Sequence, residues 1–378
     1  MPHLMSHDAS RRQFLRGLTV VGATTAVASF VTPAPSSAAP LATAATGLVH
    51  PGALHTAGQL DVAKAGIAAG TVPFTAALAR LASDPRSRGD WTATPAAALH
   101  VGGTGSNHRT LLDDTHAAYQ NALIWRLDGD EARARTASTI LNAWAARLTS
   151  VSGTPETYLQ SGIHGFLLAN AAELVRDRTE FDAAAFGAML TDVFLPLNAA
   201  ALTGSTDGCV RRFGVVWTLA HLASMTAIAV FTENASALTQ ATDYFERRPG
   251  APVVNTIPFP HDEGMGQVQS IIGIALATAV CEMAWNQGHD LYASQGSRLL
   301  SSAEWVAATV DDYTDYQDPD RLWGTSTSGA AWAILHDHYA DRQGVAVSAK
   351  LTALADRARA EGAALDRLGL GAYAYFRD

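Results

Sequence analysis

Apolar residues recur along the chain with the spacing of helices, and the period-two alternation typical of strands is nearly absent. Two kinds of helix are predicted. Helices of the first kind are apolar on nearly every side, as expected when a helix is covered all round; they are at 115–127, 165–175, 217–231, 270–285 and 329–339. Helices of the second kind carry charge on one face, as expected of an outer layer; they are at 130–148, 182–202, 236–248 and 297–313. Pro196 is predicted to kink or split the second of these.

The apolar helices begin roughly 50 residues apart, and each is followed by an amphipathic helix. A buried helix paired with a covering helix, repeated along the chain, predicts helical hairpins stacked in a curved double layer. We therefore expect an all-α fold, an α/α toroid or incomplete barrel of about five or six hairpins. An irregular all-α bundle is the alternative.

The segments that enter the apolar helices are the most polar, glycine-rich and aromatic parts of the chain. If every inner helix runs the same way, these segments share one end of the fold. Helix amino ends carry a partial positive charge and free N–H groups, which suit a bound carboxylate. A functional site is therefore predicted where these segments converge: 101–110, 155–165, 208–214, 259–269 and 320–329.

Composition and charge narrow the class of protein. The 378 residues are 48% hydrophobic and 16% charged, so the chain can bury a large core. Removing the first 44 residues, whose net charge is +2, changes the formal charge from −9 to −11. So acidic a chain is a poor partner for nucleic acid, because phosphate contacts need a basic face.

The beginning of the chain has the pattern of a twin-arginine export signal. Arg11 and Arg12 precede an apolar run, and small residues suited to cleavage follow it. We expect a signal peptide at 1–44 and a single catalytic-type domain at 45–378, with a secreted, periplasmic or cell-envelope location and no stable membrane association. A membrane anchor is the alternative, although the apolar run is short for a span.

Metal and cysteine chemistry have little support in the sequence. Cys209 and Cys281 could form a disulfide after export, but Cys281 lies in an apolar helical run where a buried free thiol is commoner. His336 and His338 have H-x-H spacing, yet two residues apart on a helix point to different faces. No cofactor is expected.

The side chains in the entry segments favour one chemistry in particular. They offer tyrosine, histidine, arginine, glutamine and helix amino ends, which suit β-elimination on a uronic-acid polymer. In that reaction the C6 carboxylate is neutralised, a tyrosine or histidine removes the C5 proton, and another such group protonates the departing oxygen.

Several long segments, in order, resemble alginate-lyase-like proteins, a polysaccharide lyase family. The resemblance covers nearly all of the chain after the signal, and implies an α/α toroid and lyase activity. The segments are VHPGALHTAGQLDVAKAGIAAGTVPFTAALARLASDP (49–85), AYQNALIWRLDGDEARARTASTILNAW (118–144), LQSGIHGFLLANAAELVRD (159–177), EMAWNQGHDLY (282–292), HDHYADRQG (336–344) and LGLGAYAY (368–375).

The chain departs from the family at its usual catalytic positions. Where the family has an asparagine at the third inner helix, Val216 precedes Trp217. The family's arginine and histidine before the fourth inner helix fall on Met265 and Gln269, or in another register on His261 and Met265. The resemblance therefore leaves open a changed reaction or a lost one.

The candidate site residues come from the entry segments. The catalytic candidates are His164, His261, Tyr158, Arg211 and Arg212, the arginines as neutralisers of a uronate. The candidates for substrate binding are Asn107, His108, Gln160, Trp217, Gln267, Gln269 and Trp323. Each has a structural alternative: a buried histidine, a surface arginine, a polar helix end or a core tryptophan.

Three functions remain open. The favoured one is an exported lyase, a monomer acting on an acidic polysaccharide or oligosaccharide. The second is a degenerate member of the alginate-lyase-like family, one that has lost the usual catalytic residues. It would bind a sugar or another small molecule, or would have been recruited to different chemistry. The third is a glycoside hydrolase, which needs two inward carboxylates; only Asp207, Asp262 and Glu263 offer them.

Overall fold

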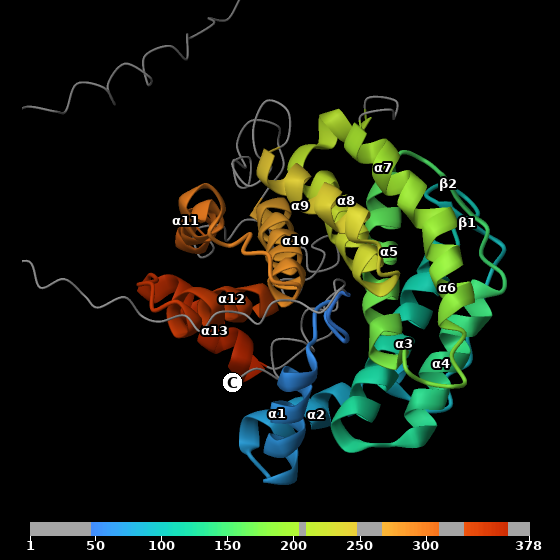
Figure 1. Cartoon of the computed structure of the whole chain (residues 1–378), viewed down its shortest axis with the longest axis horizontal. Helices are drawn as coiled ribbons and strands as arrows, with labels where there is room; N and C mark the ends of the chain where they lie inside the picture. Colours follow the sequence, from blue (N-terminus) through green and yellow to red (C-terminus); the bar gives the residue numbers. More distant parts are fainter. Residues whose placement is uncertain (1–46, 204–208, 248–266, 310–328, 362–378) are drawn as a thin grey trace, which may run out of the picture. The chain divides into compact units, whose positions relative to one another are not determined.

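Helix follows helix through the described part of the chain (Figure 1). A computed structural model describes residues 47–203, 209–247, 267–309 and 329–361, with backbone alone at 73, 209–214, 267–269, 309, 329, 360 and 361. The apolar helices are α3 (His108–Asp128), α5 (Glu156–Val175), α8 (Cys209–Phe231), α10 (Gln267–Asn286) and α12 (Gly329–His336). The others are α1 (Ala57–Ala68), α2 (Val72–Ser83), α4 (Glu131–Ala145), α6 (Ala183–Met189), α7 (Leu195–Thr203), α9 (Ala235–Arg247), α11 (Ser294–Thr309) and α13 (Ala349–Glu361).

The apolar helices pack in chain order, α3 against α5, α5 against α8, α8 against α10 and α10 against α12. Three pairs of positions give the direction of α5 and α8. Gly162 lies against Ala220 and Gly165 against Ser224, and the Arg176 guanidinium reaches the Phe231 carbonyl. Residue numbers rise together on both helices, so the two run parallel and their amino ends lie together, as the sequence predicts.

Two glycines allow the close approach of α5 to α8. A Cβ atom on Gly165 would lie 2.2 Å from the Ser224 hydroxyl oxygen, a side-chain atom that can rotate away. A Cβ atom on Gly162 would lie 2.9 Å from the Ala220 carbonyl carbon, which is backbone and cannot. Gly162 therefore sets the separation of these two helices.

Replacing Gly162 by alanine should destabilise the fold by about 1–3 kcal/mol, because the added methyl forces backbone apart in a packed layer. Gly58→Ala on α1 is the matched control, since nothing lies within 4 Å of its added Cβ. The control should be neutral or stabilising by up to about 1 kcal/mol. Urea unfolding of both variants measures the difference, and equal midpoints would contradict this packing.

The outer layer begins and ends its helices with local signals. Gly129, at φ 83°, ends α3, and the Asp130 carboxylate accepts the Ala132 N–H to start α4. In the second outer helix, a π-helical turn at Leu190–Phe194 separates α6 from α7 just before Pro196. The predicted break at Pro196 is thus confirmed as a widened turn.

By length and apolar composition alone residues 183–203 could cross a membrane, a property that helices of soluble proteins share.

Several expected loops are helical, and two strands were not expected. α5 begins at Glu156, α8 at Cys209 and α10 at Gln267, so the entry segments 155–165 and 208–214 are largely the first turns of helices. The described chain also has two short parallel strands, β1 (Ala98–Val101) and β2 (Ser150–Gly153), beside those first turns.

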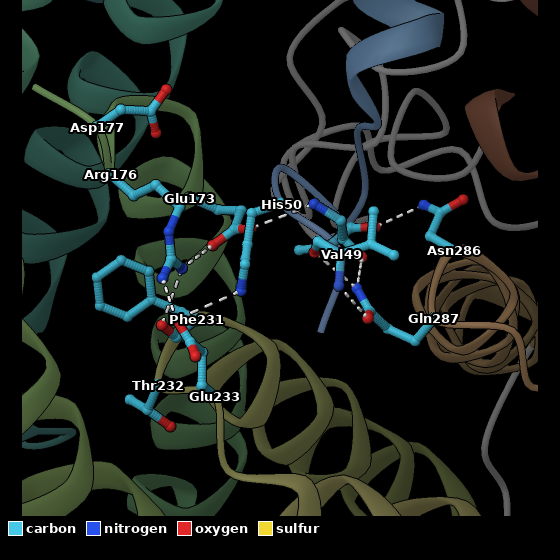
Figure 2. Close-up of polar contacts among 12 residues, drawn as sticks. Val49, His50, Glu173, Arg176, Asp177, Phe231, Thr232, Glu233, Asn286 and Gln287 are labelled. Carbon is cyan, nitrogen blue, oxygen red and sulfur yellow. Dashed lines mark hydrogen bonds and ion pairs between the residues drawn. The ribbon is translucent and has the colours of Figure 1, made fainter. Parts of the chain in front are cut away.

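A non-helical segment, residues 49–55, crosses the carboxyl-end halves of the inner helices; we call it the N-terminal strap (Figure 2). The side chain of Gln287, in the turn just after α10, accepts the Val49 N–H at 2.9 Å and donates to the Val49 and Gly52 carbonyl oxygens at 3.0 and 2.8 Å. The Asn286 amide, at the end of α10, donates to the Ala53 carbonyl oxygen at 2.6 Å. Two adjacent side chains at the carboxyl end of α10 thus satisfy part of the strap's backbone.

The strap also contacts a buried carboxylate on α5 (Figure 2). The Glu173 side chain is 2% exposed, and one of its oxygens lies 2.6 Å from His50 Nδ1 and accepts the Gly52 N–H at 3.2 Å. Its other oxygen pairs with Arg176 at 3.1 Å, and Arg176 also pairs with Glu233 at 3.0 Å. The turn after α5 is therefore tied to the strap and to α8 by charged contacts.

Candidate functional site

Two faces of α5 carry the candidate side chains. Tyr158 shares a stripe with Gly162 and Gly165, which face α8. His164 lies six residues after Tyr158, so it turns to the other side of α5 and contacts α3 instead. The candidate site is therefore two small groups of residues with α5 between them, in the amino-end halves of α3 and α5 and the middle of α8.

On the α3 side, His108 and His164 form the group. The His108 ring meets the His164 ring edge-on, with 5.7 Å between centroids. His108 is half-buried, whereas His164 is fully buried, and neither ring nitrogen of His164 has a hydrogen-bond partner. His116, about two turns further along α3, is also buried, and its Nδ1 has no partner. Buried polar atoms without a protein partner are rare, and a water or another bound molecule would satisfy them.

On the α8 side, Tyr158 and His221 form the group. The half-buried Tyr158 ring lies edge-on to the fully buried His221 ring, with 6.4 Å between centroids. His221 Nδ1 lies 2.9 Å from Asn198 Oδ1, and the Asn198 amide donates to the Ser224 hydroxyl at 2.8 Å. Asn198 comes from the outer helix α7, so the outer layer orients an imidazole of the inner layer.

Burial keeps these imidazoles neutral. Desolvation lowers the pKa of His116, His164 and His221 from 6.5 to about 3 in each case. Nearby positive charge adds to this effect for His116, through Arg86, and for His164, through His108 and His116. At neutral pH the site therefore presents neutral imidazoles, each able to donate at one nitrogen and accept at the other.

These histidines should make the fold acid-sensitive. In the unfolded chain they bind protons below about pH 6.5, whereas in the folded chain they stay neutral down to about pH 3. Stability should therefore fall as the pH falls from 6.5 towards 3, by up to about 2 kcal/mol per histidine at pH 5. Urea unfolding at pH 7 and pH 5 measures the loss.

The variant His116→Gln should lose less stability between pH 7 and pH 5 than the wild type, because it removes one buried imidazole. His289→Gln, at an exposed position, is the matched control and should lose as much as the wild type. An unchanged pH dependence in His116→Gln would mean that His116 takes up its proton in the folded state.

The other predicted site residues fall into different surroundings. Gln160 and Trp217 are nearly buried, at 8% and 7% exposure, on α5 and α8. The Asn107 side chain holds the loop before α3. Its Oδ1 accepts the His100 N–H at 2.7 Å, and its Nδ2 donates to the Ala98 carbonyl oxygen at 3.1 Å. A ligand contact from Asn107 would have to compete with those bonds.

The remaining predicted residues stay predictions. Arg211 and Arg212 lie in the first turn of α8, and Gln267 and Gln269 in the first turn of α10, with backbone alone described. His261 and Trp323 lie outside the described residues, as do the carboxyl groups weighed for a hydrolase. The described structure thus brings together Tyr158, His108 and His164, and places them beside residues the sequence analysis did not single out.

His221, Asn198 and His116 are the additions from the structure. His221 and His116 sit within apolar helical runs, where a histidine reads as part of the core. A signal was present for His221: it follows Trp217 by four residues, and so lies on the same face of the helix as a predicted site residue. Asn198 gave no such signal, because it belongs to the outer layer.

The cysteine and histidine pairs lie in other surroundings. Cys281 is a free, buried thiol whose pKa is raised by burial. His338 stacks on Tyr292 at 3.7 Å between ring centroids, while His336 pairs with Asp341 at 3.1 Å. His336, Asp337 and Asp341 could offer ligand atoms to an ion, but the Arg359 guanidinium already contacts them.

Comparison with known proteins identifies a structural neighbour. No family model matches the chain, and no curated protein matches it. An alginate lyase from Bacteroides ovatus, solved as a crystal structure at 1.60 Å resolution, has a similar fold. The two share a TM-score of 0.62 and 15% sequence identity, over 86% of this chain and 99% of the neighbour. This likeness establishes the fold class, an all-α fold of the α/α toroid type, as the sequence predicts.

Proposed function

We propose that the protein is an exported polysaccharide lyase that cleaves a uronic-acid-containing polymer by β-elimination. The observation that carries the proposal is the half-buried Tyr158 ring, in the first turn of α5, edge-on to the buried, neutral imidazole of His221. The fold of an alginate lyase around that site supports it.

The proposed chemistry uses Tyr158 as the proton-transfer group that reaches the substrate. Loss of the C5 proton and departure of the oxygen at C4 create a double bond between C4 and C5, and a tyrosine or histidine serves each proton transfer. Because α5 lies between Tyr158 and the His108–His164 pair, both transfers at the adjacent C4 and C5 atoms fall to Tyr158, which passes the proton taken from C5 to the departing oxygen. No cofactor takes part in the proposed reaction.

The described carboxylates do not favour a glycoside hydrolase. Asp114 on α3 is buried and accepts hydrogen bonds from Trp91, Thr94 and Trp144. Glu156 is exposed at the start of α5. Among the described residues near these amino ends, no two carboxylates are placed as the acid and base of that reaction.

A sugar-binding protein without turnover is the second candidate. The observation favouring it is that His164 and His221 are both 0% exposed, so neither is placed to exchange a proton with a substrate. In that case Tyr158 and His108 would bind a sugar and transfer no proton.

A panel of uronate polymers distinguishes these candidates. The purified protein is mixed with each polymer, and ultraviolet absorbance reports the unsaturated sugar end that only elimination creates. A rise with at least one polymer is expected. Binding without a rise would favour the sugar-binding candidate, and neither binding nor a rise would contradict both.

Export is a separate proposal that rests on the sequence. Replacing Arg11 and Arg12 by lysines should strongly reduce secretion of folded protein, because the paired arginines are the element of the signal that the export machinery reads. Unchanged secretion would contradict it.

A further inference from the structure

The amino end of α3 has features of an anion site that the proposed function does not yet use. No side chain caps this end. The side chain of Asn107, the residue at the cap position, is used elsewhere: its Nδ2 donates to the Ala98 carbonyl oxygen and its Oδ1 accepts the His100 N–H. The first turn also contains no acidic residue. The partial positive charge of a 21-residue helix is therefore not offset there by a side chain.

A full positive charge stands at the same place. Arg109 is the second residue of α3, and it is exposed. Within the described part of the chain it forms no ion pair, whereas Arg86, Arg126 and Arg178 all do. An arginine without a carboxylate partner beside an uncapped helix amino end favours an incoming anion.

A second, independent observation points to a ligand. His164 is 0% exposed and lies beneath His108, and neither of its ring nitrogens has a partner. A neutral imidazole always carries one N–H, which a carboxylate oxygen can accept. His108 is the first residue of α3, so the buried imidazole lies against the same helix end that carries Arg109.

We propose that the amino end of α3 is a carboxylate subsite, where Arg109 and the helix receive the carboxylate of a uronate residue neighbouring the one that is cleaved, with His164 as a donor beneath. This inference rests on the proposed function for the identity of the ligand. It assigns the two sides of α5 to different sugar residues of one chain: the α3 side holds the acid group of the neighbouring residue, and Tyr158 on the α8 side faces the bond that breaks.

Binding measurements test the subsite without requiring turnover. Trimers of mannuronate, guluronate, galacturonate and glucuronate are titrated calorimetrically into the Tyr158→Phe protein, together with the carboxyl-reduced form of each trimer. Arg109→Gln should weaken binding of the best uronate trimer about tenfold, the scale of one lost charge-assisted contact. It should not weaken binding of the carboxyl-reduced trimer.

Arg135→Gln is the matched control, an exposed arginine on the outer helix α4. It should bind every trimer as the parent protein does. Equal affinities in Arg109→Gln and Arg135→Gln, or no binding of any uronate trimer, would overturn the subsite.

The two proposals can fail separately. Unsaturated product from the wild type, with unchanged trimer binding in Arg109→Gln, would overturn the subsite and leave the lyase standing. Loss of uronate binding in Arg109→Gln, with no product from any polymer, would support the subsite and overturn the lyase.

Discussion

Replacing Tyr158 by phenylalanine should lower turnover on the best uronate polymer by about 100- to 10,000-fold, the usual scale of one proton-transfer group. The substitution removes one hydroxyl from a half-buried ring that lies edge-on to His221. The ring itself stays, so the helix packing and the affinity for substrate should change little. Initial rates of ultraviolet absorbance, with kcat and KM resolved, measure the effect.

Tyr244→Phe provides the control for that experiment. Tyr244 is a half-buried tyrosine on the outer helix α9, a helix that contributes no residue to the candidate site. Its variant should keep the wild-type rate. If Tyr158→Phe also keeps the wild-type rate, Tyr158 is not the proton-transfer group, and His108 becomes the next candidate.

Replacing Glu173 by alanine should destabilise the fold by about 3 kcal/mol, the scale of removing one partner from a buried ion pair. Glu173 is 2% exposed and contacts His50, the Gly52 N–H and Arg176. Its loss leaves two strap groups and one guanidinium with a missing acceptor. Urea unfolding at pH 7 measures the free energy change.

Glu131→Ala is the control for Glu173→Ala. The Glu131 side chain is 55% exposed and pairs with Arg178 at the surface, so its loss should cost about 1 kcal/mol or less. Glu173, where the strap binds, and Tyr158 lie at opposite ends of α5, about 22 Å apart along the helix axis. Glu173→Ala should therefore keep its turnover at temperatures where it is folded; a loss of turnover in the folded variant would link the strap to the site.

The layered helices were predictable because burial leaves a periodic trace in the sequence. Residues 217–231 lack charge on every face and became the buried part of α8, while 130–148 carry charge on one face and became α4. Pro196 was a reliable mark of a break, since a proline removes the N–H that an uninterrupted α-helix needs.

The first turns of the inner helices could not be predicted in the same way. Residues 156–164 carry Tyr158, Gln160 and His164, so their polar pattern is that of a loop. They are helical because α5 continues past the apolar core to the candidate site, where polar side chains replace packing residues. The loss of periodicity that hid the helix start is thus caused by the site itself.

Neither the strap nor Asn198, which orients His221, is marked by a periodic pattern of apolar residues in the sequence. Val49 and Gln287 are 238 residues apart in the sequence, and several contacts of residues 49–55 join a distant side chain to the strap's backbone. Asn198 contacts His221 from the outer layer, where a single polar residue in an apolar run gives no direction. Such contacts depend on how the layers are stacked, which the spacing of apolar residues along one helix does not specify.

Cleavage of the best uronate polymer in water enriched in oxygen-18, followed by mass spectrometry of the oligosaccharides, tests the central claim most directly. Elimination forms a double bond and adds no water at the cleaved bond. The account predicts that each new non-reducing end belongs to a fragment lighter by one water than its hydrolytic counterpart, with no oxygen-18 incorporated during cleavage. Fragments of hydrolytic mass that carry oxygen-18, or an intact polymer throughout the panel, would contradict it.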